Sequence, residues 1–388
     1  MTVVGLRVVV IGAGIGGLAV ARALALRGAD VTLLDQASEI TEVGAGLQIS
    51  PNGFAVLRGL GLDRALVASS VQAQAVCLKD HSGAPVVRLD LMQLPDPAYY
   101  FVHRADLIDI LARGAREAGV RIRLLQRVTS VDGGPQPVVH LANETSLNAD
   151  LVIGADGLHS VLRPVLNGQG APFFTGQVAW RAVVPNTAGR GAEAWVHMGP
   201  GRHVVSYPLR GGAALNIVAV QERKQWADEG WNHGDDPANL RAAFADFGAP
   251  LRDILDQVNE VRLWGLFRHP VARVWQRDHL ALLGDAAHPT LPFLAQGASM
   301  ALEDAWVLAD AVARCDSIAA GLAAYQVRRE GRVRRVIAAA NGNAWKYHIG
   351  FTPLRLAAHT VMRLGGKLAP MRMMRQFDWL YTHDVTSN

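Results

Sequence analysis

A glycine-rich turn near the start of the chain constrains the fold most strongly. The stretch Gly12–Gly17 reads GAGIGG and matches the spacing G-x-G-x-x-G. It follows a β-branched run, Leu6–Ile11, and precedes the alanine- and leucine-rich segment Leu18–Arg27, which predicts strand, turn and helix. In such a unit the first glycine permits the turn, the second admits a pyrophosphate, and the third lets helix and strand pack closely. The turn therefore predicts a dinucleotide-binding α/β domain.

A carboxylate stands where this domain type needs one. Asp35 lies eighteen residues beyond Gly17, after the predicted strand Val31–Leu34. A carboxylate there accepts hydrogen bonds from ribose hydroxyls and disfavours a 2′-phosphate. Strand, helix and acid together favour a dinucleotide site over a glycine-rich packing turn, but they do not separate NAD from FAD.

The rest of the chain predicts α/β elements that bracket a β-rich insert. Runs of alternating hydrophobicity, separated by turn glycines, predict an antiparallel sheet of strands at Val178–Val184, Ala194–Met198, His203–Leu209 and Ala214–Val220. With 388 residues, the chain is long enough for more than one domain. We expect a discontinuous cofactor-binding domain (1–75, 101–175, 275–345), a β-sheet substrate domain (76–100, 176–274) and a C-terminal helical segment (346–388).

Charge leaves two interpretations open. The net charge is +4, and five arginines fall between Arg328 and Arg335 in a predicted helix. Such a run fits a basic patch for nucleic acid or anionic lipid, or else a solvated helix face. No nucleic-acid-binding motif accompanies it, so we favour the solvated face and expect no nucleic-acid partner.

Other features indicate a cytoplasmic protein without a metal. Cys77 and Cys315 are far apart, which fits a reducing compartment. The apolar stretch Leu6–Leu26 is interrupted by glycines and arginines, so we expect no membrane insertion. We see no signal peptide, and the histidines show no metal-ligand spacing.

Two later segments make a family resemblance specific. Val152–Gly157 is a strand that runs into Asp-Gly, and His279–Pro289 is a strand that ends in Gly-Asp. These segments resemble the DG and GD motifs of the para-hydroxybenzoate hydroxylase family, the single-component FAD-dependent aromatic monooxygenases. Within the family, the chain resembles the salicylate, 3-hydroxybenzoate and 6-hydroxynicotinate hydroxylases in particular. Further matching segments are Glu42–Asn52, His103–Leu107, Gln177–Arg181 and Ala295–Ala305.

The resemblance implies a Rossmann-like FAD-binding domain of the glutathione-reductase type, interrupted by the substrate domain. It implies that Asp35 holds the adenosine ribose, Arg104 the pyrophosphate region and Asp285 a ribityl hydroxyl. Asp156 supports the cofactor and the path of the nicotinamide donor, or else forms a local turn. The full set of expected cofactor residues is Gly12, Gly14, Ile15, Gly17, Asp35, Gln36, Gln48, Arg104, Asp156, Asp285, Gly297 and Ala298.

Part of the predicted flavin environment comes from a helix end. The helix Ala298–Arg314 aims its N-terminus at the flavin, where its dipole stabilises the anion of the reduced ring. We expect Glu303 and Asp304 in this helix to be solvated or structural. Ala295 stands where many members of the family have glycine, which restricts the neighbouring loop. Asp35 likewise replaces the commoner glutamate and shortens the reach to the ribose.

The family's chemistry suggests the substrate side. In these enzymes NADH or NADPH reduces FAD, O2 adds to the flavin, and the C4a-hydroperoxide hydroxylates a small hydroxylated aromatic acid. A base near the substrate hydroxyl increases the nucleophilicity of the ring. The inserted sheet should form the roof of the pocket. The expected catalytic residues are His203, Tyr207, Gln296 and Pro292, and the expected substrate-binding residues are Gln48, Arg181, His203, Tyr207 and Pro292.

Alternatives remain at this point. The same fold supports a flavin-dependent reductase or oxidase of a bulkier phenol or lipid, or a non-catalytic flavin-binding scaffold. The segment Thr352–Tyr381 predicts two amphipathic helices, which suit a membrane-surface contact, a dimer contact or a cap on the cofactor domain. We favour the cap. A homodimer is possible.

Overall fold

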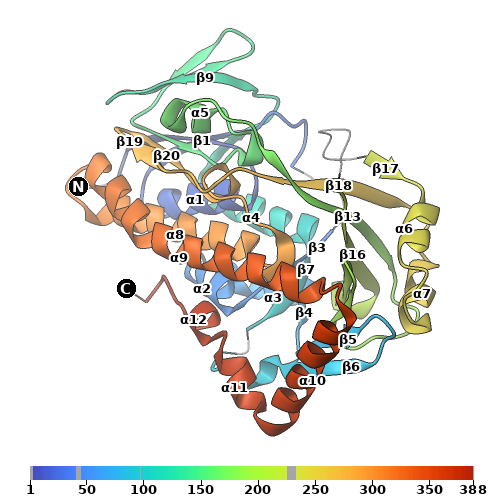
Figure 1. Ribbon diagram of the computed structural model, residues 1–388. Helices are drawn as coiled ribbons and strands as arrows, with labels where there is room; N and C mark the ends of the chain where they lie inside the picture. The colour runs from blue at the N-terminus through green and yellow to red at the C-terminus, as the bar shows by residue number, and fades with distance from the viewer. Residues whose placement is uncertain (1–2, 41–44, 97, 225–232, 388) are drawn as a thin grey trace.

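The fold has two large sheets, and the first of them is a mainly parallel sheet with helices packed against it (Figure 1). The computed structural model describes residues 3–40, 45–96, 98–224 and 233–387. Apolar, β-branched strands pair in parallel, as expected for a sheet covered on both faces, and one antiparallel strand closes the edge. In spatial order the strands are β19 (Gln276–Arg277), β20 (Leu280–Leu282), β12 (Leu151–Gly154), β1 (Arg7–Ile11), β2 (Asp30–Leu34) and β8 (Arg121–Arg123).

Helix α1 (Ile15–Ala25) packs closely on strands β1 and β2 of this sheet, and a glycine at its start makes the close approach possible. A Cβ built on Gly17 would lie 1.9 Å from the carbonyl oxygen of Gly12, so only glycine fits there. Helix α1 packs against both α8 and α4, and α8 packs against α9. The helices are α1 (Ile15–Ala25), α4 (Arg104–Glu117), α8 (Gly297–Arg314) and α9 (Ile318–Tyr347). The strand–turn–helix prediction at the start of the chain is confirmed.

The inserted segment forms an eight-stranded sheet, and its four predicted strands are confirmed as antiparallel neighbours. Among the described strands of this sheet, only β14 and β5 pair in parallel. The order is β17 (His233–Asp235), β18 (Val261–Arg268), β13 (Phe173–Pro185), β16 (Ala214–Glu222), β15 (Arg202–Leu209), β14 (Glu193–Gly199), β5 (Ala75–Asp80) and β6 (Pro85–Asp90). Helices α6 (Pro237–Ala243) and α7 (Ala249–Leu255) pack on one face through a core that includes Trp180 and Phe244.

Small sheets and helices complete the fold. One three-stranded sheet contains β3 (Gly46–Ile49), β7 (Tyr100–His103) and β4 (Val71–Gln72), and another contains β9 (Val128–Asp132), β10 (Val138–Leu141) and β11 (Ser146–Asn148). The remaining helices before the C-terminal segment are α2 (Pro51–Gly59), α3 (Asp63–Ser69) and α5 (Leu162–Asn167). No helix in the described ranges has the length and apolar character needed to cross a bilayer.

The C-terminal segment differs from its prediction. It forms three helices rather than two, α10 (Thr352–Leu368), α11 (Pro370–Arg375) and α12 (Asp378–Tyr381). Helices α10 and α11 pack on β6 of the eight-stranded sheet, and α12 alone packs on α2. The segment therefore caps the eight-stranded sheet more than the parallel-sheet part of the fold, because the methionines of α10 and α11 contact apolar side chains of β5, β6 and β14.

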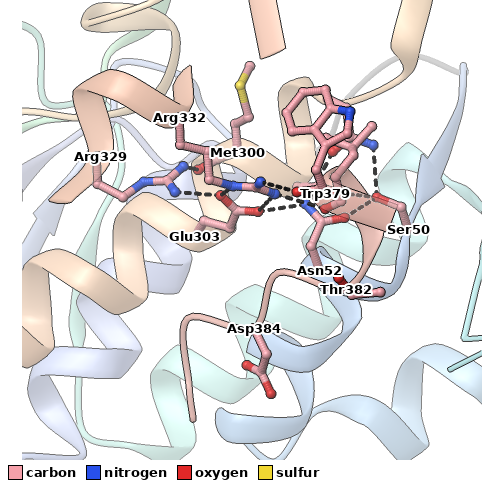
Figure 2. Close-up of polar contacts among 12 residues, drawn as sticks. Ser50, Asn52, Met300, Glu303, Arg329, Arg332, Trp379, Thr382 and Asp384 are labelled. Carbon is pink, nitrogen blue, oxygen red and sulfur yellow. Dashed lines mark hydrogen bonds and ion pairs between the residues drawn. The ribbon is translucent and has the colours of Figure 1, made fainter. Parts of the chain in front are cut away.

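A buried ion-pair network joins α8, α9 and α2 (Figure 2). Glu303 pairs with Arg329 at 2.5 Å and with Arg332 at 2.7 Å, and it accepts a hydrogen bond from Asn52 Nδ2 at 2.6 Å. Arg332 also donates to the carbonyl of Trp379, which connects the network to α12. The glutamate is thus satisfied on every side, as a buried charge must be.

The neighbouring carboxylate extends the network to the GD turn. Asp304 accepts hydrogen bonds from Gly284 N at 3.0 Å and from Arg329 Nε at 2.7 Å, and its Oδ2 lies 2.5 Å from His288 Nε2. The structural interpretation of Glu303 and Asp304 is therefore confirmed. The solvated-face interpretation of the arginine run is wrong for Arg329 and Arg332, because both side chains form ion pairs with the buried carboxylates of α8.

This network predicts a pH-dependent stability. Burial alone raises the pKa of Glu303, but Arg329 and Arg332 outweigh it and bring that pKa to about 2. A carboxyl whose pKa is lowered by folding stabilises the protein above its unfolded pKa, and this contribution disappears as the pH falls toward the folded value. We expect the free energy of unfolding to drop between about pH 5 and pH 2.

The variant E303Q tests the same network at neutral pH. It removes one of the two buried charge partners of Arg329 and the carboxylate that pairs with Arg332. We therefore expect a loss of about 3–5 kcal/mol in the free energy of unfolding at pH 7 and a shallower acid dependence. Denaturant unfolding measures both. The matched control D109N removes an exposed pair with Arg113 and should change stability by less than about 0.5 kcal/mol. Equal stability of E303Q and wild type would contradict this account.

Candidate functional site

A cavity of about 430 Å³ lies between the carboxyl ends of the parallel strands and the inserted sheet. On the cofactor side it is lined by ten of the twelve residues expected there: Gly12, Gly14, Ile15, Asp35, Gln48, Arg104, Asp156, Asp285, Gly297 and Ala298. On the other side it is lined by Arg181, His203, Val205, Tyr207, Val218 and Val220. One cavity therefore unites the cofactor and substrate residues that the sequence predicts separately.

The glycine turn is shaped to receive a phosphate group. Gly12 has φ +101°, and a Cβ built there would lie 2.5 Å from the Ala155 carbonyl oxygen. A Cβ on Gly14 would instead meet no atom within 4 Å, because this residue borders the cavity. Gly14 is the N-cap of α1, so free backbone N–H groups of the helix begin beside it.

Three carboxylates line the cavity in different ways. Asp35 accepts hydrogen bonds from Ala13 N and Ala37 N, which hold its carboxylate at the end of β2. Asp156 Oδ2 accepts from Val161 N, whereas its buried Oδ1 has no partner among the described residues. Asp156 thus makes the local turn bond and still offers one oxygen to a ligand. Asp285 faces the cavity, and burial raises its pKa.

Two cations face these acids. Arg104 begins α4, and burial together with Arg181 lowers its pKa to about 10, against the opposing effect of Asp285. The buried Nε of Arg181 has no partner among the described residues. Cations and carboxylates that line a cavity and keep unused hydrogen-bonding capacity suit a ligand with phosphates and hydroxyl groups. The residues present therefore fit FAD.

The helix predicted beside the flavin begins as expected. Gly297 starts α8 and lines the cavity with Ala298, and the first turn of α8 carries no acidic residue to oppose an anion. Ala295 adopts a left-handed conformation with φ 52° and ψ 35°. Alanine at this position was expected to restrict the loop. The structure shows that it does so by holding a strained left-handed backbone at the edge of the cavity.

Three predicted site residues lie elsewhere. Gln296 is buried and donates to Ser50 Oγ at 2.9 Å while it accepts from Asn52 at 3.1 Å, so it joins α8 to α2 rather than facing a ligand. Gln36 is exposed after β2 and does not line the cavity. Gly17 serves helix packing. Within the matching segment Glu42–Asn52, residues 42–44 lie outside the described residues.

The inserted sheet forms the opposite wall through strand register. Val218 pairs with both Arg181 and Val205, and Val220 pairs with His203, so these residues share one face of three strands. Gly46 approaches this wall closely: a Cβ there would lie 2.6 Å from the Tyr207 ring, and its N–H donates to Asn216 Oδ1 at 2.7 Å. Asn216 was not predicted, because nothing local in the sequence marks a partner 170 residues away.

The two candidate bases differ in protonation. Burial, with a further contribution from His348, lowers the pKa of His203 well below its ordinary value, so the ring is neutral near pH 7. Burial raises the pKa of Tyr207 although Arg181 and Gln48 oppose it, so the phenol keeps its proton. His203 is therefore suited to accept a proton and Tyr207 to donate a hydrogen bond.

A second cavity of about 250 Å³ adjoins the first. The two share Gln48, His203, Val205, Pro292 and Ala295 in their walls. The rest of the second wall is mainly apolar and comes from β5, β6, β14 and the C-terminal helices. Pro292 thus stands at the junction of the two spaces. In the described part of the chain, no three His, Cys, Asp or Glu side chains gather as metal ligands would.

Gly14 supplies a direct test of the cofactor cavity. In G14A the added methyl group occupies space where the phosphates of a dinucleotide would approach, while the protein itself leaves room for it. We expect a normally folded protein whose FAD affinity falls about tenfold or more, since overpacking costs about 1–3 kcal/mol. Flavin content and fluorescence titration measure this. G331A, which also adds a methyl group in open space, is the control and should retain FAD. Unchanged FAD affinity in G14A would contradict the assignment.

Comparison with known proteins identifies the family. The family described as "FAD binding domain" matches residues 5–340. The 3-amino-4-hydroxybenzoate 2-monooxygenase of Streptomyces cremeus is 37% identical over 317 residues, which cover 78% of this chain and 77% of that protein. The 3-hydroxybenzoate 6-hydroxylase of Klebsiella oxytoca is 35% identical and covers 88% of this chain and 89% of its own.

A solved structure agrees in architecture. HpxO of Klebsiella pneumoniae, in complex with FAD and uric acid, superposes with a TM-score of 0.85 at 26% identity, covering 96% of this chain and 95% of that one. The resemblance and the expected fold class are thus confirmed. The chain belongs to the FAD-binding-domain family and is a flavin-dependent monooxygenase of the para-hydroxybenzoate hydroxylase type.

Proposed function

We propose that the protein hydroxylates a small aromatic acid that already carries a ring hydroxyl group, with NADH or NADPH and O2 as co-substrates. One observation carries the proposal: a half-buried arginine, Arg181, and a neutral histidine, His203, line the same cavity from one face of the inserted sheet, with β16 between their two strands. The first suits a carboxylate and the second suits a phenol. The relatives support it, since their names specify 3-amino-4-hydroxybenzoate and 3-hydroxybenzoate.

The residues divide the work by their chemistry. Arg181, whose Nε has no partner among the described residues, binds the substrate carboxylate. His203 accepts the proton of the ring hydroxyl, which makes the ring more nucleophilic, and Tyr207 donates a hydrogen bond to the resulting oxyanion. The apolar side chains Val205, Val218 and Val220 pack against the ring and exclude water.

FAD would be held by the glycine turn, Asp35, Arg104, Asp156 and Asp285, and it supplies the redox and oxygen chemistry. The first turn of α8 places its backbone N–H groups at the cavity, where they stabilise negative charge. The protein's own contribution is to orient the ring, hold its oxyanion and keep the site dry.

The second cavity favours a second candidate substrate class. Its apolar wall would accept an alkyl or aryl substituent on the aromatic ring, which is the bulkier-phenol alternative. The cytoplasmic location and the homodimer stay predictions.

Substrate-stimulated oxidation of NADH and NADPH tests the proposal. The purified, FAD-loaded protein is supplied in air with 3-amino-4-hydroxybenzoate, 3-hydroxybenzoate, salicylate, 4-hydroxybenzoate or 6-hydroxynicotinate, and products are identified by mass. We expect at least one acid to stimulate oxidation and to gain one oxygen atom. If only alkyl-substituted phenols do so, the second candidate replaces the first. If no aromatic compound does, the hydroxylase proposal is wrong.

The variant R181Q tests how the acid is bound. Loss of a charged hydrogen bond worth about 1.5–3 kcal/mol should raise KM for the aromatic acid about 10- to 100-fold. The same variant should bind the corresponding phenol without a carboxylate as well as wild type does. The exposed Arg252 provides the control R252Q. An equal loss for acid and phenol would show that Arg181 does not bind the carboxylate.

A further inference from the structure

A chain of three side chains leads from the cavity to the protein surface. His203 Nδ1 lies 2.7 Å from His348 Nε2, and His348 Nδ1 lies 2.8 Å from a carboxylate oxygen of Glu222. His203 and His348 are only 2% and 6% exposed, whereas the Glu222 side chain is 54% exposed. One end of the chain thus faces the substrate space and the other faces solvent.

The backbone fixes the three residues relative to one another. His203 of β15 pairs with Val220 of β16, and Glu222 lies two residues farther along β16 on the same face. The Gly201 N–H donates to the His348 carbonyl oxygen, and the Glu222 N–H donates to the Gly201 carbonyl oxygen. His348, which follows α9, is therefore tied to the turn between β14 and β15.

The hydrogen-bond pattern sets the tautomer of each ring. The Glu222 carboxylate only accepts, so His348 donates from Nδ1 and keeps a lone pair on Nε2. His203 must then donate from Nδ1 to that lone pair. Its own lone pair is left on Nε2, to which no described residue donates, and His203 lines the cavity. The chain therefore presents a basic nitrogen to a ligand.

The surroundings of His203 exclude water from the inner link. Its ring lies 5.5 Å from Phe293 and 5.2 Å from Tyr347, measured between ring centroids. Glu222 at the outer end of the chain shares a surface pocket with Arg202, Arg223 and Lys224, and Arg181 lines the same cavity as His203 at the inner end. A proton taken up inside this wall can leave by way of His348.

We propose that His348 and Glu222 form a proton relay that exchanges the ring-hydroxyl proton of the substrate between His203 and solvent. The relay rests on the proposed function, since it requires a phenolic substrate. His348 and Glu222 act through His203 and do not touch the ligand themselves, so they are positioning residues.

The transfers balance without any redox partner. The substrate O–H bond breaks as a bond forms between the proton and His203 Nε2; the Nδ1 proton of His203 passes to His348 Nε2; and the Nδ1 proton of His348 passes to Glu222 and then to water. Phenol has become phenolate plus a solvated proton, and both histidines are neutral in the other tautomer. The reverse sequence returns the proton to the product and restores the starting tautomers.

The electrostatics favour histidines that pass a proton on over histidines that keep it. Burial lowers the pKa of both histidines, and for His348 the Glu222 carboxylate only partly opposes this. A ring with a lowered pKa does not keep a proton near neutral pH. The proton taken from the substrate must therefore be passed on.

Proton release on ligand binding tests the relay apart from turnover. The oxidised, FAD-loaded protein is mixed with 3-amino-4-hydroxybenzoate or 3-hydroxybenzoate in weak buffer with a pH-indicator dye, and the ultraviolet spectrum reports phenolate. We expect release of a proton and formation of phenolate to slow at least about tenfold in H348F. E222Q should slow proton release and phenolate formation less than H348F does. E222D, which keeps the carboxylate, should show rates close to those of wild type. E260Q, which changes another exposed glutamate, is the control.

Two outcomes would overturn the relay, and they are distinguishable. If the acid binds and is hydroxylated but H348F and E222Q form phenolate at the wild-type rate, the relay is wrong and the proposed function stands. If no phenolic acid perturbs the flavin spectrum or is hydroxylated by wild type, both fail together. Thermal unfolding and ligand affinity of each variant, measured alongside, must match wild type for the rate effect to count in favour of the relay.

Discussion

Two adjacent buried carboxylates, Glu303 and Asp304, hold together the segments that enclose the cavity. Asp304 fixes the GD turn through Gly284 and His288, which places Asp285 at the cavity. Glu303 fixes the start of α2 through Asn52. Breaking a buried ion pair leaves an unpaired charge in a low-dielectric interior, which is costly. These ion pairs therefore fix the arrangement of the segments that they join. The precision of the flavin side thus depends on groups that do not touch the ligand.

The two faces of the site have different origins. Strand ends and helix N-termini of the parallel sheet supply backbone N–H groups and carboxylates, which suit phosphates and ribose. The inserted antiparallel sheet supplies side chains at alternate positions, here Arg181, Val205 and Tyr207, which suit a small ring with polar substituents. Changing the second face alters the substrate without disturbing the cofactor, which explains how one fold serves many aromatic compounds.

Local patterns, together with the family resemblance that they carry, predicted the cofactor side. The glycine turn, Asp35, Asp156 and Asp285 each lie at a strand end that short-range sequence reveals, and all face one cavity. Alternation also predicted the four antiparallel strands. Such features depend on spacing within a single element, which a sequence displays directly.

Contacts between distant elements were not predictable in this way. The arginine cluster was predicted to be solvated because the sequence does not show that Arg329 pairs with Glu303. Gln296 was predicted to lie beside the flavin because the sequence does not show that its amide donates to Ser50. His348 lies 145 residues from His203, so no motif joins them. The third C-terminal helix was missed because α11 and α12 have only six and four residues, and amphipathic periodicity is uninformative over such short segments.

The central claim is that this cavity performs oxygen insertion into a hydroxylated aromatic acid. The most direct test is turnover of that acid under isotopically labelled O2, with mass analysis of the product. The account predicts that the new hydroxyl group carries the labelled oxygen and that one NADH or NADPH is consumed for each product molecule. Unlabelled product, or nicotinamide oxidation that yields only hydrogen peroxide, would contradict it.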